Sequence, residues 1–211
     1  MQVDVFSDMV CPWCRIGKKN LSDALDEIKN RLGVDIAVNF RAFQLDPSVP
    51  PEGVPFMHHM KRMGSPERVR SLLQRVTEIG ESIGLKFRYD LVTVMPNTLL
   101  AHRVGALLSP CRRAEWVDAV MTAYFEEGHD IGHLQVLLQL AERLGLDGGN
   151  IAQRLAAGDG LIDIEHDYDE AVRMGITGAP FFVINNETII SGAYPASGFV
   201  EVFEKIIMAG T

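Results

Sequence analysis

The chain has 211 residues, of which 47% are hydrophobic and 23% charged, with a formal net charge of −8 and only 3 cysteines. This composition is typical of a folded globular protein and excludes a disordered, collagen-like or disulfide-rich chain. The 20 lysines and arginines are scattered along the chain, so no basic stripe is present to neutralise a phosphate backbone, and we expect no nucleic-acid partner.

The chain begins with a predicted βαβ unit. Residues 2–7 are predicted to form a strand that leads directly into Cys11-Pro12-Trp13-Cys14, and apolar residues then recur at helical spacing as far as Gly33. Residues 34–43 are rich in strand-forming side chains. Such a unit joins two parallel strands by a right-handed crossover.

A helical block is predicted to follow. The prolines between residues 45 and 55 mark a change of architecture, because proline continues neither a sheet interior nor a helix. Ser65-Pro66-Glu67 then offers an N-cap and a first-turn proline to a helix that ends before Gly84. Further helices are predicted at residues 98–108, 114–127, 131–144, 150–157 and 162–174. No convincing strand is predicted within this block.

The strand pattern returns near the C-terminus. Residues 181–184 and 188–190 are predicted to form two strands that the turn Asn185-Asn186-Glu187 joins, and residues 197–208 to form a final helix. The order of elements is therefore βαβ, a helical block and an αββα ending, which predicts an α/β fold.

Nothing in the sequence predicts a membrane anchor or an export signal. No run approaches the roughly 18 consecutive apolar residues of a membrane-spanning helix. The first residues, MQVDVFSDMV, do not have the basic start, apolar stretch and cleavage site of a secretory signal. We therefore expect a cytoplasmic protein with no membrane partner, although a mature chain whose signal has been removed would look the same. In a reducing cytosol, paired cysteines more often do redox work or bind metal than stabilise a fold.

Cys11 and Cys14 form a Cys-x-x-Cys pair, a pattern that zinc sites, haem attachment sites and redox centres share. A structural zinc site needs further Cys or His ligands in a compact group, and no second paired motif stands near the first, so we expect no metal. Haem attachment needs a His directly after the second cysteine, where this chain has Arg15. A redox centre is the interpretation that remains.

The position of the pair, where a strand meets a helix, supports that interpretation. At a helix N-terminus the first N–H groups have no intrahelical partner and the macrodipole is positive, so a thiolate is stabilised there. Pro12 suits the first helical turn. We expect Cys11, at the exposed end, to be the attacking sulfur and Cys14, one turn further and more buried, to be the resolving thiol. Two inert thiols are the alternative, but they would not explain Trp13, which we expect at an exposed loop tip facing substrate.

Several segments together resemble the DsbA-like branch of the thioredoxin superfamily. They are Asp8 to Cys14 (DMVCPWC), residues 96–103 (PNTLLAHR) and residues 177–183 (TGAPFFV). With FQLDP at residues 43–47 and YFEEGHDI at residues 124–131, the chain looks closest to the FrnE type of that branch. The resemblance spans nearly the whole chain.

The resemblance implies a thioredoxin fold with a large all-helical insertion after the second strand. The stretch between Cys14 and Pro180 agrees, because it is far longer than a plain thioredoxin domain of roughly 100 residues allows. We therefore expect a discontinuous thioredoxin-like domain made of residues 1–46 and 162–211, and an inserted helical domain made of residues 47–161.

Further site residues follow from the same resemblance. The bond between Ala179 and Pro180 is implied to be cis and packed against the cysteines, with the N–H and C=O of Ala179 free to pair with an extended substrate strand. Asn97 and His102 are implied to face the active site, with His102 donating a hydrogen bond to substrate or thiolate. Asp8 either tunes the thiols or is a turn or capping acid, and we favour the second role.

Cys111 and a group of three methionines each allow a structural and a functional interpretation. Cys111 follows Pro110 and precedes two arginines, an electropositive setting, but it has no local partner and we expect a free surface or semi-buried thiol. Met57, Met60 and Met63 either line an adaptable peptide groove or pack a helix against a loop, and we favour packing.

These features predict a cytosolic thiol-disulfide oxidoreductase that requires no cofactor and acts on a thiol or disulfide of a protein, a peptide or a small molecule. Hydroxychromene-carboxylate isomerases and kappa-class glutathione transferases are related to the resembled family, but they typically have Ser at the position of Cys11 and bind glutathione there. The presence of both cysteines favours dithiol redox cycling, with glutathione open as reductant or co-substrate. A peptide-binding or chaperone module with idle cysteines is a third candidate. The sequence leaves the redox direction, the physiological substrate and the oligomeric state open.

Overall fold

The computed structural model describes residues 1–209, and its centre is a four-stranded sheet. The strands are β1 (Gln2–Ser7), β2 (Ala37–Ala42), β5 (Phe181–Ile184) and β6 (Thr188–Ser191), in the order β2-β1-β5-β6. β1 is parallel to β2 and antiparallel to β5, which in turn pairs with β6. The first and last parts of the chain thus form one sheet, as the predicted βαβ and αββα segments require.

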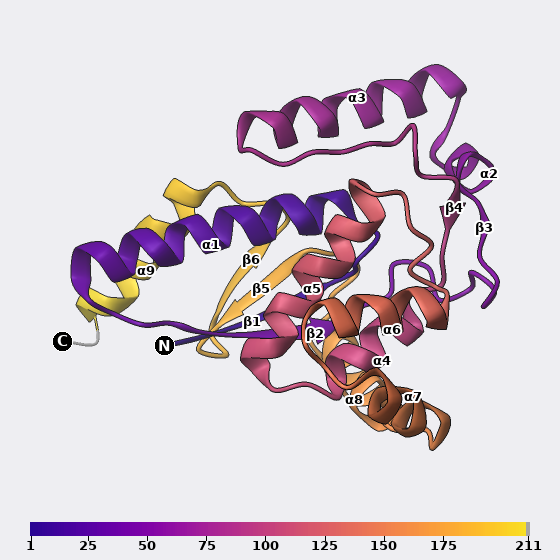
Figure 1. The fold of residues 1–211 in the computed structure, drawn as a ribbon. Helices are drawn as coiled ribbons and strands as arrows, with labels where there is room; N and C mark the ends of the chain where they lie inside the picture. Colours follow the sequence, from indigo (N-terminus) through magenta and orange to yellow (C-terminus); the bar gives the residue numbers. More distant parts are fainter. Residues whose placement is uncertain (210–211) are drawn as a thin grey trace.

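Helices cover both faces of this sheet. α1 (Pro12–Leu32) and α9 (Ala196–Ala209) pack against each other on one face (Figure 1), where Phe182 contacts Phe199 of α9. Phe6 points to the opposite face, where it forms a separate apolar cluster with a residue of α8 (Leu161–Arg173). Successive residues of a strand point to opposite faces, so β1 contributes side chains to both layers.

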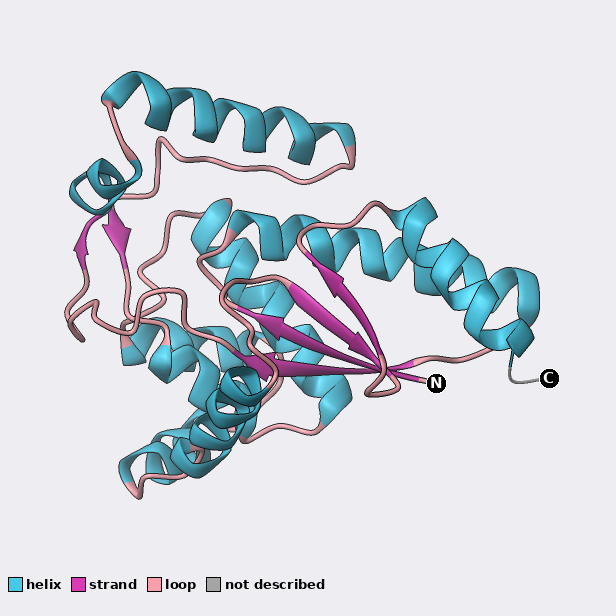
Figure 2. Cartoon of the chain, turned by 180° about the vertical axis from the view of Figure 1, so that it is seen from behind, coloured by secondary structure: helices cyan, strands magenta, loops and turns pink. Residues whose placement is uncertain are grey.

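The block between β2 and β5 is mainly helical. Its helices are α2 (Phe56–Met60), the 3-10 turn η1 (Lys61–Met63), α3 (Pro66–Ser82), α4 (Leu99–Ala106), α5 (Pro110–Phe125), α6 (Leu134–Arg143), α7 (Gly148–Ala156) and α8. α5 begins before the predicted residue 114, because Ser109 and Pro110 supply the same N-cap and first-turn signal as Ser65 and Pro66. α3 lies beyond α1, on the side away from the sheet (Figures 1 and 2).

The prediction that this block contains no strand was wrong. β3 (Val54–Pro55) and β4 (Val94–Met95) pair antiparallel beside α2. Each strand has only 2 residues, too few for an alternating pattern to be recognised in the sequence.

One apolar core continues from the sheet through α1 into the helical block. Its largest fully buried side chains include Trp116 and Tyr124 of α5 as well as Phe182 and Phe199 beside the sheet. The boundaries between a thioredoxin-like and an inserted domain stay a prediction. Among the described residues, no helix combines the length and the apolar character that crossing a membrane requires.

Close packing of α1 on β5 depends on a glycine. A Cβ added at Gly17 would lie 3.0 Å from Cγ of Pro180 and 3.1 Å from Cζ of Phe182. The absence of a side chain at this position therefore lets the first turns of α1 approach the segment that carries Pro180.

We expect Gly17→Val to lower the free energy of unfolding by about 1 to 3 kcal/mol, because the added methyl groups force Pro180 and Phe182 apart from the helix. Urea unfolding measures this change. Ser22→Val, at an exposed position of the same helix, is the matched control and is expected to cost much less. Equal stability of the two variants would contradict the close approach.

Candidate active site

The two cysteines lie at the N-terminus of α1. Cys11 is the N-cap residue and Pro12 occupies the first turn. The N–H groups of Cys14 and Arg15 donate to the carbonyl of Cys11 at 3.1 and 3.2 Å, and the N–H of Cys11 donates to the carbonyl of Asp8 at 3.1 Å. Within the described chain no side chain caps this end and no acid stands in the first turn. The partial positive charge of the helix therefore acts on the Cys11 sulfur.

Both cysteines are free thiols and both are buried, with 3% of Cys11 and 1% of Cys14 exposed. The expectation of an exposed Cys11 is wrong, because the helical block covers this end of α1. The Cys14 sulfur accepts a hydrogen bond from the N–H of Asp8 at 3.4 Å. Burial raises the pKa of the Cys14 thiol well above its ordinary value, so Cys14 is a neutral thiol at neutral pH.

The segment before β5 meets Cys11 directly. The Cys11 thiol donates to the carbonyl oxygen of Ala179 over 3.6 Å, and the Ala179–Pro180 peptide is cis. We expected the carbonyl of Ala179 to be free for a substrate strand. It is instead the acceptor for the Cys11 thiol, so a substrate can use it only after that weak hydrogen bond is released.

Asp8 and His102 form a buried pair beneath the cysteines. The Asp8 carboxylate accepts from the N–H of Leu45 at 2.8 Å and lies 3.3 Å from Nε2 of His102, which belongs to α4. Asp8 is therefore not the turn or helix-capping acid that we favoured, because its side chain ties the β1–α1 loop to the segment after β2 and to α4. His102 contacts Asp8 rather than the Cys11 sulfur, so the expected donor to substrate or thiolate is a positioning residue.

Asn97 has a structural role near the site. Its Nδ2 donates to the carbonyl of Val49 at 2.6 Å and its Oδ1 accepts from the N–H of Leu99 at 2.9 Å. These bonds hold the start of α4 against the loop before β3. Among the described residues, its neighbours Pro96 and Thr98 line a cavity beside Cys11, but Asn97 does not.

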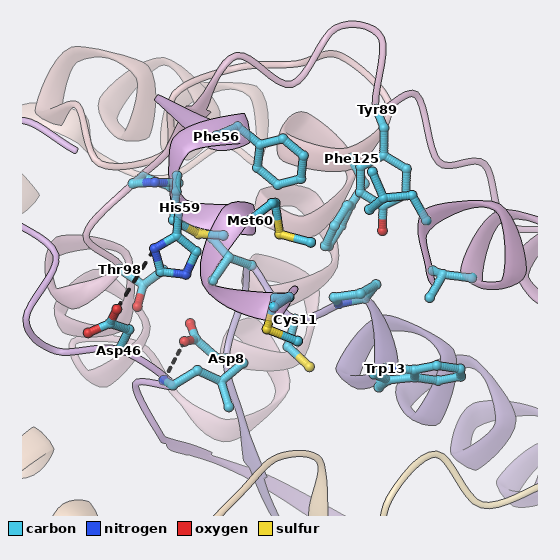
Figure 3. A pocket seen from close by; sticks show the side chains of 18 of the residues that line it. Asp8, Cys11, Trp13, Asp46, Phe56, His59, Met60, Tyr89, Thr98 and Phe125 are labelled. Carbon is cyan, nitrogen blue, oxygen red and sulfur yellow. Dashed lines mark hydrogen bonds and ion pairs between the residues drawn. The ribbon is translucent and has the colours of Figure 1, made fainter. Parts of the chain in front are cut away.

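A cavity of about 190 Å³ lies over Cys11 (Figure 3). Pro12 and Trp13 belong to its wall together with Cys11, so Trp13 stands in the first turn of α1 beside the cavity rather than on an exposed loop tip. The remaining lining is mostly apolar and comes largely from the helical block: Val10, Leu45, Val49, Phe56, Met60, Met63, Leu72, Leu73, Val76, Met95, Pro96 and Phe125, with the polar Asp8, Asp46, His59, Tyr89 and Thr98.

The methionine cluster is part of this cavity. Phe56, Met60 and Met63 line it, whereas Met57 is 53% exposed and lies outside it. Our favoured interpretation, packing of a helix against a loop, was therefore incomplete. The spacing of Phe56, Met60 and Met63 places them on one helical face, and this signal was available in the sequence.

Sequence reasoning missed Tyr89, which lies in the irregular segment between α3 and β4. Its ring stacks on Phe56 and on Phe87 with centroid distances of 5.9 and 5.8 Å and meets the edge of Phe125 at 6.2 Å. Its hydroxyl is buried and finds no hydrogen-bond partner among the described residues. A segment without hydrophobic periodicity gave no signal that this side chain reaches the site.

Cys111 and a cluster of acids stand apart from this arrangement. Cys111 is a free, exposed thiol at the start of α5, and the guanidinium of Arg113 beside it donates to the carbonyl of Gly105 at 2.8 Å.

His166, Asp167 and Glu170 place ligand atoms close enough for a metal ion. Arg41, however, bridges Asp167 and Glu170 at 2.8 and 3.3 Å, so these two acids already have a cationic partner and we assign no metal there.

The chain belongs to the family of DsbA-like thioredoxin domains, whose model matches residues 2–204. The crystal structure of a probable DsbA oxidoreductase from Streptomyces coelicolor is 28% identical, with a TM-score of 0.86 over 97% of this chain and 89% of that chain. The uncharacterized protein YwbO of Bacillus subtilis is 29% identical over an alignment of 213 positions, which covers 98% of this chain and 96% of YwbO.

The structure of a 2-hydroxychromene-2-carboxylate isomerase is similar in fold alone, with 14% identity and a TM-score of 0.73 over 100% of this chain and 98% of that chain. These comparisons confirm the resemblance to the DsbA-like family and the thioredoxin fold with added helices.

We expect Asp8→Ala to lower the free energy of unfolding by about 2 kcal/mol or more, because the N–H of Leu45 and the buried ring of His102 lose their partner. Asp8→Asn is expected to cost less, since its amide oxygen still accepts from Leu45. Urea unfolding of both variants tests this, with Asp26→Ala at an exposed position of α1 as control. A cost for Asp8→Ala as small as that of the control would contradict the pairing.

We expect iodoacetamide to modify Cys111 readily at neutral pH while Cys14 stays unmodified, because only a thiolate reacts and burial keeps Cys14 both protonated and covered. Peptide mass spectrometry after timed labelling measures each cysteine. Since the pKa of Cys14 is raised, its protection should weaken only as the pH rises far above the ordinary thiol value of about 8.5, or when the chain unfolds. Rapid labelling of Cys14 in the folded protein would contradict this assignment.

Proposed function

We propose that the protein is a thiol-disulfide oxidoreductase that uses Cys11 as nucleophile and Cys14 as resolving thiol. The position of the Cys11 sulfur carries this proposal. It lies at the positive end of α1, 3.6 Å from the carbonyl oxygen of Ala179, and it borders an apolar cavity. Membership of the DsbA-like family supports the same chemistry.

The reaction proceeds by two exchanges. The Cys11 thiolate attacks one sulfur of a substrate disulfide, the substrate S–S bond breaks, and the first substrate thiolate leaves and takes up a proton. Cys14 then gives up its proton and attacks the Cys11 sulfur, which forms the Cys11–Cys14 disulfide and releases the second substrate thiolate. Two electrons pass to the substrate, and an external dithiol restores the protein by the reverse exchanges.

The different environments of the two sulfurs explain why Cys11 attacks the substrate first and Cys14 reacts second. Cys11 lies at the helix N-cap, where a negative charge is stabilised, and it borders the cavity. Burial keeps the pKa of Cys14 raised, so Cys14 stays protonated until a mixed disulfide has formed next to it. A thiol that ionises late does not compete with Cys11 for the substrate.

A glutathione-dependent isomerase is the second candidate, because the fold is similar to that of a 2-hydroxychromene-2-carboxylate isomerase. The free thiol of Cys14 one turn from Cys11 favours the redox reaction over it. A peptide-binding or chaperone module stays a third candidate, and the cytoplasmic location stays a prediction.

We expect Cys11→Ser to reduce dithiothreitol-driven disulfide reduction to the uncatalysed rate. Cys14→Ser, mixed with the substrate disulfide in the absence of dithiothreitol, should stop after one exchange with a substrate fragment bound to Cys11. The turnover rate and the intact mass of each variant are measured. Cys111→Ser is the matched control and should turn over as the wild type does.

Two outcomes would contradict the proposal. An isomerase would tolerate Cys14→Ser and would require added glutathione, and a binding module would keep its function in both variants. Neither would leave a substrate fragment on Cys11 of the Cys14→Ser variant.

A further inference from the structure

In the described part of the chain, the wall of the cavity over Cys11 contains acidic side chains but no lysine or arginine. Of the described residues that line it, Asp8 and Asp46 carry carboxyl groups, and none is a lysine or an arginine. Burial lowers the pKa of His59, a third titratable group of the wall, which favours its neutral form. Arg62 binds Asp46 at 2.9 Å from outside the cavity and is mostly exposed. An anionic ligand therefore meets no lysine or arginine in this wall.

Arg15, which directly follows Cys14, is engaged elsewhere. Its guanidinium donates to the carbonyl of Met121 at 3.2 Å and to the carboxylate of Glu126. It also lies over the rings of Phe87 and Phe125, 5.5 and 5.7 Å from their centroids. Phe125 is part of the cavity wall, so an aromatic ring rather than a cation faces a bound molecule on this side.

Tyr89 supplies a hydrogen-bond donor to this apolar space. Its ring is fixed by stacking on Phe56, and its hydroxyl points from the ring toward the end of α1 that carries Cys11 (Figure 3). Burial, with a contribution from the charge of Cys11, raises the pKa of Tyr89, which keeps the O–H group protonated. A buried donor without an acceptor is unfavourable, so an acceptor on a bound molecule is favoured at this point.

Size and access restrict what reaches the sulfur. Only 3% of Cys11 is exposed, and the cavity beside it measures about 190 Å³. An apolar protein cavity of roughly 150 Å³ is large enough to hold benzene. The space therefore admits one ring or branched apolar group attached to sulfur, whereas the surface of a folded protein does not reach Cys11.

We propose that this site takes small uncharged disulfides and thiols whose sulfur carries an apolar ring or branched group with a hydrogen-bond acceptor for Tyr89, and that it discriminates against glutathione. The inference rests on the proposed function and adds the substrate class. The exchanges are those given above, with an external dithiol as reductant. Glutathione is disfavoured because its carboxylates would enter a wall that holds Asp46 and no cation.

The experiment compares kcat/KM of the wild type for dipyridyl disulfide, diphenyl disulfide and glutathione disulfide. Each value is divided by the rate constant of the same disulfide with free dithiothreitol, which removes differences in intrinsic reactivity. We expect the two aromatic disulfides to exceed glutathione disulfide by about tenfold or more on this scale.

Variants then test the role of Tyr89 and of the wall charge. Tyr89→Phe should lower the ratio of dipyridyl to diphenyl disulfide about tenfold, because only the pyridyl nitrogen accepts from the hydroxyl. Tyr168→Phe, at an exposed position of α8, should leave the ratio unchanged. Met63→Lys places a cation at the half-exposed edge of the wall and should raise turnover of glutathione disulfide severalfold in a salt-sensitive manner. Met57→Lys is the control, because Met57 is equally exposed but lies outside the cavity, and it should not raise that turnover.

The inference is overturned if the wild type reduces glutathione disulfide or a folded protein disulfide as efficiently as the aromatic disulfides, or if Tyr89→Phe leaves the ratio unchanged. The proposed function stands in those cases, because Cys11 still turns over a disulfide. Failure of the wild type to reduce any of the disulfides overturns the proposed function and this inference together.

Discussion

The contact between the Cys11 thiol and the carbonyl of Ala179 joins two positions that are 168 residues apart, and the geometry of the site depends on it. The sheet brings the two positions together, because β1 pairs with β5. The chain passes from β1 through Cys11 into α1, and β5 starts directly after Pro180. The helical block leaves the sheet after β2 and returns before β5. Its length therefore does not displace the sulfur from the Pro180 segment.

The helical block supplies what the sheet and α1 do not. Most of the cavity lining comes from it, so the block shapes the space beside a sulfur that the rest of the fold positions. The Asp8 carboxylate connects the two parts, since it accepts from Leu45 and lies 3.3 Å from His102 of α4. The block is thereby connected directly to the loop that precedes Cys11.

Features with a local cause could be predicted from the sequence. The strand before Cys11, Pro12 in the first turn and the order of elements follow from residue type and spacing. Features that depend on distant segments could not. The pairing of Asp8 with His102 spans 94 positions, and Tyr89 comes from a segment without periodicity. The burial of Cys11 has the same origin, because only the folded block shows that it covers the end of α1.

Asp46 at the cavity wall distinguishes charged from uncharged molecules that approach Cys11. A disulfide without charge passes Asp46 at little electrostatic cost, whereas an incoming thiolate is repelled by it. In the proposed reaction the same charge disfavours a thiolate inside the cavity, which speeds its release and slows its return. In the proposed reaction the wall charge therefore changes how fast disulfides enter and thiolates leave, and it leaves the equilibrium between them unchanged.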